Sequence, residues 1–360
     1  MSDVNAELLG FLKYAMDPAR KATDLHLVPF KKPQIRVNGL LTDIEGSEML
    51  KPENVANLVD SLISDNKRRK LEEERVIDFS FSEPGLGRFR VNINYQRSSI
   101  HAAIRALPLE IPSFSKLGLP SIVETFTTKS RGLFLVTGAT GSGKSTTMAS
   151  LLDIINERYN YHIITIEDPI EYLHRHKRGM VTQREIGEDA LSFSQALRSA
   201  LRQDPDVIMV GEMRDAETIQ IALSAAETGH LVISTLHTVG AAKSIDRILD
   251  SIPPGQQEQI RNQFSTILEG IVSQQLIARA DGKGVVLASE IMFVNTAVRH
   301  LIREGTPYQI NSIMQTGQSQ GMQLMEENLA RLFKEDVITR EEAELRANDQ
   351  QLLRQFLTRR

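Results

Sequence analysis

The sequence predicts an α/β protein with two domains, a mixed α and β domain followed by one built on a parallel sheet. With 360 residues, the chain is too long for one ordinary hydrophobic core. Its second half contains short apolar strand candidates separated by helices, which is typical of a parallel sheet covered on both faces. A phosphate-binding loop pattern follows the first of those strands, at the end where open α/β sheets bind ligands.

The first domain is expected at residues 1–107, from helical spacing of apolar residues and from alternation of apolar with polar residues. The expected elements are helices at 3–16 and 53–74, strands at 24–28 and 33–39, two strands flanking a turn at 84–87, and a strand at 100–107. In the last two strands, alternation places Arg90 and Arg105 on a polar face, opposite residues such as Val91 and Ile104.

A linker is expected at 108–120, where three prolines interrupt any sustained period. The second domain then covers 121–360. Its strands are expected at 132–137, 162–166, 207–210 and 231–235. After about residue 252 the pattern is mostly helical, and helices are expected at 256–276, at 322–333 and after the capping box Thr339-Arg340-Glu341-Glu342.

The loop pattern G-x-x-x-x-G-K-[ST] predicts that the second domain binds a nucleotide with its phosphates at a helix N-terminus. Lys144 would contact the β- and γ-phosphates, and the Ser145 hydroxyl would bind Mg²⁺. The residues expected to form this site are Gly138, Ala139, Thr140, Gly141, Ser142, Gly143, Lys144, Ser145 and Thr146. The alternative is a glycine-rich turn that matches by accident, which the flanking strand and helix disfavour.

Composition excludes several other classes of protein. The net charge is -4, whereas a dedicated DNA-binding domain is usually basic, so nucleic acid is not expected as a partner. The chain has no cysteine, which excludes disulfides and thiolate zinc sites, and it has neither H-E-x-x-H nor G-x-S-x-G. A polar, acidic N-terminus and the lack of a long apolar run favour a cytoplasmic protein that reaches a membrane only through partners.

Glu212 follows the strand at 207–210 and should lie at the same sheet edge as the phosphate loop. Hydrolysis needs a group that positions water, and we predict that Glu212 orients or deprotonates it. This stretch resembles a Walker B element with glutamate in the usual aspartate place. The alternative is an acidic residue that caps the strand.

Glu167 and Asp168 follow the strand at 162–166 and should lie at that edge too. Neighbouring residues on a strand point to opposite faces, so only one of them can face a metal, and Glu167 is favoured. Asp168 has an alternative structural role as a helix cap before Pro169.

Two histidines stand at the ends of the apolar strand 231–235. His237, at the carboxyl end, could contact the γ-phosphate and report its presence, while His230 at the start is harder to place in the same site. For both residues, the alternative is an ordinary hydrogen-bonded structural histidine.

Four successive blocks resemble one family, the secretion and type IV pilus motor ATPases, and its retraction branch in particular. The blocks are GATGSGKST, TIEDPIEY, RQDPDVIMVGEMRD and GHLVISTLHT, and further likeness lies in TDLHL, GRFRVN, AAKSIDRI and EGIVSQQL. The retraction branch also carries a helix reading AIRNLIRE, which AVRHLIRE at 297–304 matches except at Val298 and His300. The resemblance covers nearly the whole chain.

This resemblance implies a PAS-like N-terminal domain followed by a RecA-like ATPase domain with a helical C-terminal region, assembled as a homohexamer. It implies ATP and Mg²⁺ as cofactors and Arg90 and Arg105, with Arg97 as a weaker candidate, as arginines that reach the phosphates. Such arginines neutralise charge on the transferring phosphoryl group. It also implies pilus retraction, with an inner-membrane platform protein and an accessory retraction ATPase as partners.

Three alternatives stay open. An accessory retraction ATPase is hard to distinguish within the family, although the AVRHLIRE helix favours the main motor. A RecA-like ring that moves DNA would need a basic channel with stacking aromatics, whereas this chain has no tryptophan and 5% aromatic residues. A nucleotide switch without hydrolysis is the third.

Overall fold

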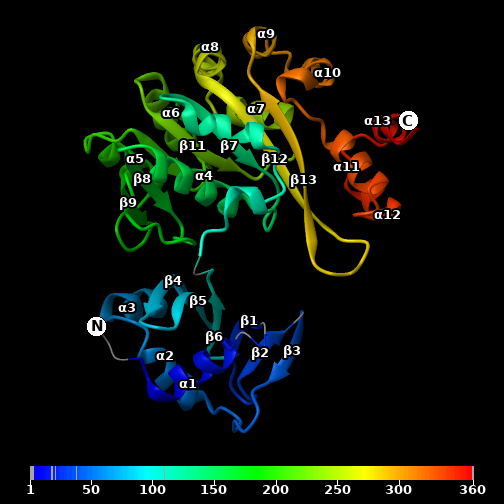
Figure 1. Ribbon diagram of the computed structural model, residues 1–360. Helices are drawn as coiled ribbons and strands as arrows, with labels where there is room; N and C mark the ends of the chain where they lie inside the picture. The colour runs from blue at the N-terminus through cyan, green and yellow to red at the C-terminus, as the bar shows by residue number, and fades with distance from the viewer. Residues whose placement is uncertain (1–3, 18, 21, 38, 109, 359–360) are drawn as a thin grey trace. The chain divides into compact units, whose positions relative to one another are not determined.

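The computed structural model describes residues 4–17, 19–20, 22–37, 39–108 and 110–358. Contacts divide the chain into two compact units, unit 1 at 1–110 and unit 2 at 111–360, each described here by itself (Figure 1). The division lies inside the segment 108–120. Phe114 and Leu119 of that segment are buried in the core of unit 2, so part of it is folded rather than extended between units.

Unit 1 is an antiparallel sheet with helices packed on one face, which buries the apolar side of each strand. The sheet order is β3-β2-β1-β6-β5-β4. The elements are α1 (Ala6–Ala15), β1 (Ala22–Leu27), β2 (Gln34–Val37), β3 (Leu40–Asp43), α2 (Pro52–Asp60), α3 (Asp65–Glu74), β4 (Val76–Glu83), β5 (Gly87–Gln96) and β6 (Ser99–Ala106). Leu12 of α1 and Leu58 of α2 share a core with Val91 and Ile104. The predicted alternation in β5 and β6 is confirmed.

The helix predicted at 53–74 is wrong, because the chain forms α2 and α3 with a break between Asp60 and Asp65. Ser64 adopts an extended backbone as the N-cap of α3. Leu62 and Ile63 in the break are buried. Both residues continue the apolar spacing of α2, so the pattern resembles one long helix. Ser64-Asp65 is a helix-start signal within that pattern, and the prediction overlooked it.

Unit 2 is built on a seven-stranded sheet in the order β13-β12-β7-β11-β10-β8-β9. All neighbouring strands are parallel except β12 and β13, which form an antiparallel hairpin. The strands are β7 (Gly132–Thr137), β8 (His162–Glu167), β9 (Met180–Glu185), β10 (Val207–Val210), β11 (Leu231–Leu236), β12 (Leu268–Ala278) and β13 (Val285–Phe293). The predicted strands at 132–137, 162–166, 207–210 and 231–235 are confirmed.

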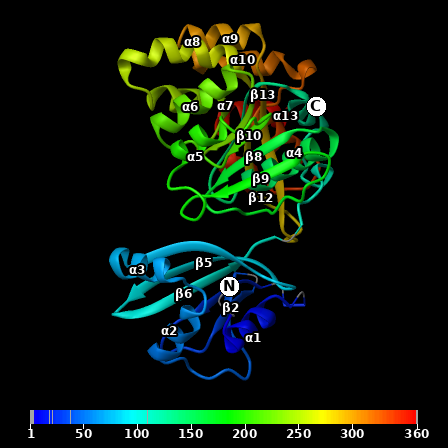
Figure 2. The ribbon, with the colours of Figure 1, turned by 90° about the vertical axis from the view of Figure 1, so that its left-hand side faces the viewer.

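Helices cover both faces of this sheet (Figure 2). They are α4 (Lys144–Arg158), α5 (Phe193–Ala200), α6 (Ala216–Glu227), α7 (Ala241–Asp250), α8 (Gln257–Ile267), α9 (Thr296–Arg303), α10 (Ile310–Thr316), α11 (Met325–Lys334), α12 (Arg340–Arg346) and α13 (Gln350–Thr358). Short 3₁₀ turns lie at Phe114–Lys116, Ser121–Thr128, Pro254–Gln256, Pro307–Gln309 and Gln318–Gln320. Phe134 and Val136 of β7 face α4, whereas Leu133 and Leu135 face the core with α5 to α8. Thr339 caps α12, as the sequence predicts.

The helix predicted at 256–276 is wrong beyond Ile267, where β12 begins. β12 lies between β7 and β13, and most of its side chains are buried, whichever face of the sheet they point to. A strand buried on both faces shows no alternation of apolar and polar residues, so its sequence cannot be told from a buried helix by periodicity. The strands β9 and β13, at the two sheet edges, were also missed.

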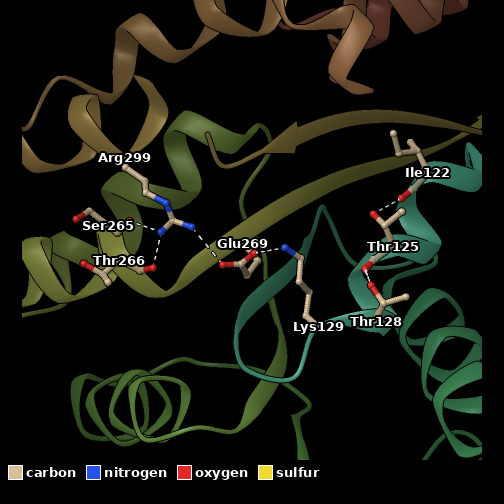
Figure 3. Close-up of polar contacts among 8 residues, drawn as sticks. All are labelled: Ile122, Thr125, Thr128, Lys129, Ser265, Thr266, Glu269 and Arg299. Atoms are coloured by element: carbon tan, nitrogen blue, oxygen red, sulfur yellow. Dashed lines mark hydrogen bonds and ion pairs between the residues drawn. The ribbon is translucent and has the colours of Figure 1, made fainter. Parts of the chain in front are cut away.

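The segment AVRHLIRE forms most of α9, and Figure 3 shows how it is attached. Val298 and Ile302 are buried on its inner side. The Arg299 guanidinium donates to the backbone oxygens of Ser265 and Thr266 in the last turn of α8, and it lies 3.2 Å from Glu269 Oε1. No helix in the described parts of the chain is both long and apolar enough to cross a membrane.

Candidate functional site

The candidate site lies at the carboxyl edge of the parallel strands of unit 2. β7, β11, β10 and β8 are neighbours in the sheet, so the segments that follow them emerge at one edge. Leu236 pairs with Thr137, and Val210 pairs with Ile166, which sets the strand ends level. One sheet edge therefore carries all four predicted features, namely the phosphate loop, Glu167, Glu212 and His237.

The phosphate loop, residues 138–145, depends on glycine backbone conformations. The φ angles of Gly138, Gly141 and Gly143 are 141°, 78° and 88°, a region that side chains disfavour. A Cβ on Gly138 would lie 2.4 Å from the Gln274 backbone oxygen, so β12 passes directly against the loop. α4 begins at Lys144, which directs its first amides toward the loop. The buried Ser142 Oγ has no hydrogen-bond partner among the described residues.

Lys144 is only 8% exposed, and its ammonium lies over the loop. Nζ donates to the backbone oxygens of Gly138 and Ala139, at 2.9 Å each. Burial lowers the pKa of Lys144, while the nearby carboxylates of Glu171 and Glu212 oppose that shift. Ser145 and Thr146 follow in the first turn of α4, where Thr146 Oγ1 lies 2.9 Å from the Tyr172 hydroxyl.

Glu212 contacts a histidine and an arginine at the end of β10. Its Oε2 lies 3.3 Å from His237 Nε2 and 2.6 Å from Arg214 Nε, which are charge contacts without hydrogen-bond geometry. The Glu212 side chain is 12% exposed, whereas those of His237 and Arg214 are largely open to solvent. Arg214 was missed by sequence reasoning. Its signal is the spacing of two from Glu212, which puts both side chains on one side of an extended segment.

Glu167 is buried at the end of β8, and Asp168 is exposed, so the two point in different directions as expected. Glu167 Oε1 accepts hydrogen bonds from Thr165 Oγ1 at 2.7 Å and from Gln183 Nε2 at 3.1 Å. Burial raises the pKa of Glu167 to about 7, against the effect of these two donors.

His230 does not join the site within unit 2. It precedes β11, at the opposite end of that strand from His237. Its Nδ1 lies 2.9 Å from the Ala225 backbone oxygen at the end of α6, which is the contact of a structural histidine.

The three predicted arginines all belong to unit 1. Arg90 and Arg105 are direct neighbours in the β5–β6 register. Each has an acidic partner, Asp78 at 3.9 Å from Arg90 and Asp24 at 2.8 Å from Arg105. Arg97 lies in the turn at the other end of the same hairpin and is exposed, so it is not brought to the first two.

Gln274 of β12 is a second residue that sequence reasoning missed. Its Nε2 donates to Thr147 Oγ1 at 2.8 Å, and both side chains are buried beneath the loop. The available signal is the polar stretch Ser273-Gln274-Gln275 between the apolar pairs Ile271-Val272 and Leu276-Ile277. Buried polar side chains in such a run need a partner, and here the partner is the helix of the phosphate loop.

Comparison with known proteins gives the family. The model of the family "Type II/IV secretion system protein" matches residues 19–358. A twitching motility protein of Neisseria gonorrhoeae is 48% identical over 322 residues, which are 89% of this chain and 86% of that protein. The type IV pilus retraction ATPase PilT of Pseudomonas aeruginosa is 46% identical over 341 residues, 95% of this chain and 97% of that protein.

A solved structure, the pilus retraction motor PilT with bound ADP, superimposes with a TM-score of 0.90 at 49% identity. It covers 96% of this chain, and this chain covers 98% of it. The α/β fold, with an antiparallel N-terminal sheet and a mostly parallel second sheet, is thus that of the solved motor. This chain belongs to the Type II/IV secretion system protein family and is one of its nucleotide-binding ATPases.

Proposed function

We propose that this chain is the ATP-hydrolysing motor of type IV pilus retraction. The observation that carries the proposal is the pairing of Glu212 with His237 at the sheet edge that also bears the phosphate loop. A largely buried carboxylate beside a phosphate site can activate water, which a mere nucleotide carrier does not need. The identity of 46% to a retraction ATPase over 95% of the chain supports the cellular role.

In this proposal the phosphate loop binds ATP. The amides at 139–146 and the N-terminus of α4 hold the phosphates, and the Lys144 ammonium turns from its loop carbonyls to the β- and γ-phosphates. The buried, unpaired Ser142 Oγ is available to the same ligand. Because its contacts with the loop carbonyls keep the Lys144 ammonium inside the loop, the side chain needs to move little to contact bound phosphates.

The residues at the edge also fit Mg²⁺. Ser145 would hold the ion, with Glu212 and Glu167 as the nearby carboxylates. The described residues contain no cluster of three or more acidic or histidine side chains suited to a metal. That fits Mg²⁺, which proteins usually bind through one or two side chains together with phosphates and water. When bound, the ion would neutralise charge on the phosphates.

Glu212 is proposed to orient the attacking water and accept its proton, and Lys144 to stabilise charge on the leaving phosphates. His237 contacts Glu212 and would report whether the γ-phosphate is present, while Glu167 supports the ion site. Arg90 and Arg105 would neutralise phosphoryl charge, with Arg97 and His230 as weaker candidates for nucleotide contact.

The larger assembly follows from the family. We propose a homohexameric ring of PAS-like first units and RecA-like second units. The ring passes the motion driven by hydrolysis to an inner-membrane pilus platform protein, at the cytoplasmic face of the membrane. An accessory retraction ATPase is a further expected partner. The second candidate function is that accessory role itself.

The catalytic assignment is tested by steady-state ATP hydrolysis. Lys144→Ala and Glu212→Gln should each lower kcat by about a hundredfold or more, the scale of a lost positioning group. Glu217→Gln is the matched control, because Glu217 is exposed on α6 and pairs with Arg198. Turnover near wild type in Glu212→Gln would remove this assignment.

The cellular role is tested by deleting the gene and imaging surface pili. Hyperpiliated cells without twitching indicate retraction, and bald cells indicate assembly. If cells with the deletion twitch normally but retract their pili less strongly against a load, the accessory role is favoured. Stimulation of hydrolysis by DNA would support a DNA-moving ring instead.

A further inference from the structure

A buried carboxylate on β13 connects two helices to the candidate site. Glu290 is 4% exposed, and its Oε1 accepts the backbone N–H of Ala241 at 2.6 Å. Ala241 is the first residue of α7. The backbone amide of Met325, the first residue of α11, also faces Glu290 and favours its charged form. One side chain thus satisfies the unpaired amide at the start of α7 and lies beside the start of α11.

Ser273 of β12 stands directly opposite Glu290 in the hairpin register. Its Oγ accepts the N–H of Gly240 at 3.0 Å. Two consecutive amides, those of Gly240 and Ala241, are therefore held by a pair of facing side chains, which we call the β12–β13 clamp. Gly240 has a φ of 94°, a backbone shape that depends on such support.

The clamp ends the short segment that carries His237. From His237 only Thr238 and Val239 intervene before Gly240. The segment is braced internally, because Ser244 Oγ donates to the Gly240 backbone oxygen at 2.7 Å and lies 2.6 Å from Thr238 Oγ1. At the other end, β11 holds the chain in the sheet. The direction of the His237 ring toward Glu212 depends on both ends.

We propose that Glu290 is a positioning residue for ATP hydrolysis, which acts by holding the first amide of α7 and so the place of His237 against Glu212. This inference rests on the proposed function, since it needs Glu212 and His237 to act on the nucleotide. It also gives the C-terminal helices a physical connection to the site, because the start of α11 lies beside the same carboxylate.

The surroundings of Glu290 explain why glutamate suits this place. The positive ends of two helix dipoles oppose the burial that raises the pKa of Glu290, so they offset part of the cost of a negative charge there. A glutamine could accept from Ala241 with its oxygen, but its NH₂ group would then face the Met325 amide, donor against donor. Glu290→Gln should accordingly keep part of the clamp, and Glu290→Ala none of it.

The chain offers a matched control in Glu326 of α11, a second buried glutamate. Its Oε1 accepts the N–H groups of Asn348 and Asp349 at 2.9 Å each, so it holds the start of α13 and not the His237 segment. Glu326→Ala removes a carboxylate of equal size from the same region. It should lower the unfolding midpoint while the kcat per folded chain stays near wild type.

The experiment measures kcat and the KM for ATP of the folded, full-length variants. Glu290→Ala should lower kcat by about tenfold or more with KM changed less than about twofold, because the binding loop is intact. Glu290→Gln and Ser273→Ala should fall between it and the wild type. If Glu290→Ala does not fold, the kcat of Ser273→Ala tests the proposal in its place. Unchanged kcat, or a rise in KM alone, overturns the proposal.

A double-mutant cycle with His237→Ala tests the route of the effect. If Glu290 acts through His237, adding Glu290→Ala to His237→Ala should lower kcat by less than about twofold more. Full additivity would show that Glu290 acts elsewhere and overturns the inference while leaving the proposed function intact. If His237→Ala alone has normal kcat, both the role of His237 and this inference fail, whereas loss of Glu212→Gln activity would still support the ATPase assignment.

Discussion

Glu212 Oε2 lies 3.3 Å from His237 Nε2, although the two residues belong to different strand ends. The contact arises because β10 and β11 are adjacent and parallel, with Val210 beside Ser234. Glu212 follows Val210 by two positions and His237 follows Ser234 by three, so both lie at the same edge. A polar side chain packed against the proposed water-orienting carboxylate restricts the directions in which that carboxylate can point.

We expect His237→Ala to lower kcat by about ten- to a hundredfold, because Glu212 loses its neighbour across the edge. His237→Gln should retain more activity, since its polar amide can still lie against the carboxylate. Steady-state hydrolysis at saturating ATP measures both. His300→Ala is the control, because His300 contacts Glu304 of its own helix. Equal activity of the alanine and glutamine variants would contradict a need for a polar side chain beside Glu212.

Gly138→Ala should destabilise unit 2 even without nucleotide. The new Cβ would lie 2.4 Å from the Gln274 backbone oxygen and 2.6 Å from Ser142 Oγ, so the loop and β12 must separate. Gly282→Ala is the comparison, since Gly282 also has positive φ, at 67°, but no described atom within 4 Å of its Cβ position. We expect Gly282→Ala to cost about 1 kcal/mol from backbone strain alone. Gly138→Ala should cost roughly 1–3 kcal/mol more from the clash, as denaturant unfolding would show. Equal losses would place the loop away from β12.

Arg299→Ala should destabilise unit 2 by about 2–3 kcal/mol, because carbonyls of α8 and the Glu269 carboxylate lose a charged donor. Figure 3 shows the guanidinium directed at all three acceptors. Lys129→Ala should cost less than about 1 kcal/mol, as Lys129 is half exposed and its ion pair with Glu269 is screened. Thermal and denaturant unfolding of the two variants measure the difference. A larger loss for Lys129→Ala would reverse this order.

Glu290 should make stability depend on pH. Burial raises its pKa from 4.5 to about 7, with Glu326 of α11 adding to the rise and the two amides and Lys243 of α7 opposing it. Between these values the folded chain holds a proton that the unfolded chain releases, so the contribution of Glu290 to stability falls as pH rises through that window. The free energy of unfolding of Glu290→Gln relative to wild type should therefore increase from pH 4.5 to 7, by up to about 3 kcal/mol. Parallel pH profiles of the two proteins would contradict this.

The strands around the site could be predicted because their signals are local. β7, β8, β10 and β11 are short apolar runs bounded by turns, as parallel strands covered on both faces must be. β12 could not be recognised, because an apolar run of the same kind joined directly to α8 has no turn to separate them. The break before Ser64 was lost for a related reason, since buried Leu62 and Ile63 continue the helical spacing across it.

The sequence by itself determined the phosphate loop and the strand ends that carry Glu167, Glu212 and His237. It also determined that Arg90 and Arg105 lie on the polar face of their strands. These depend on spacing along one short segment, which the order of residues alone specifies. Only the tertiary structure decided that Arg214 and His237 converge on Glu212, that Gln274 lies beneath the loop, and that Glu290 holds the segment of His237. Such contacts join segments far apart in the chain, and they exist because sheet register and helix packing bring those segments together.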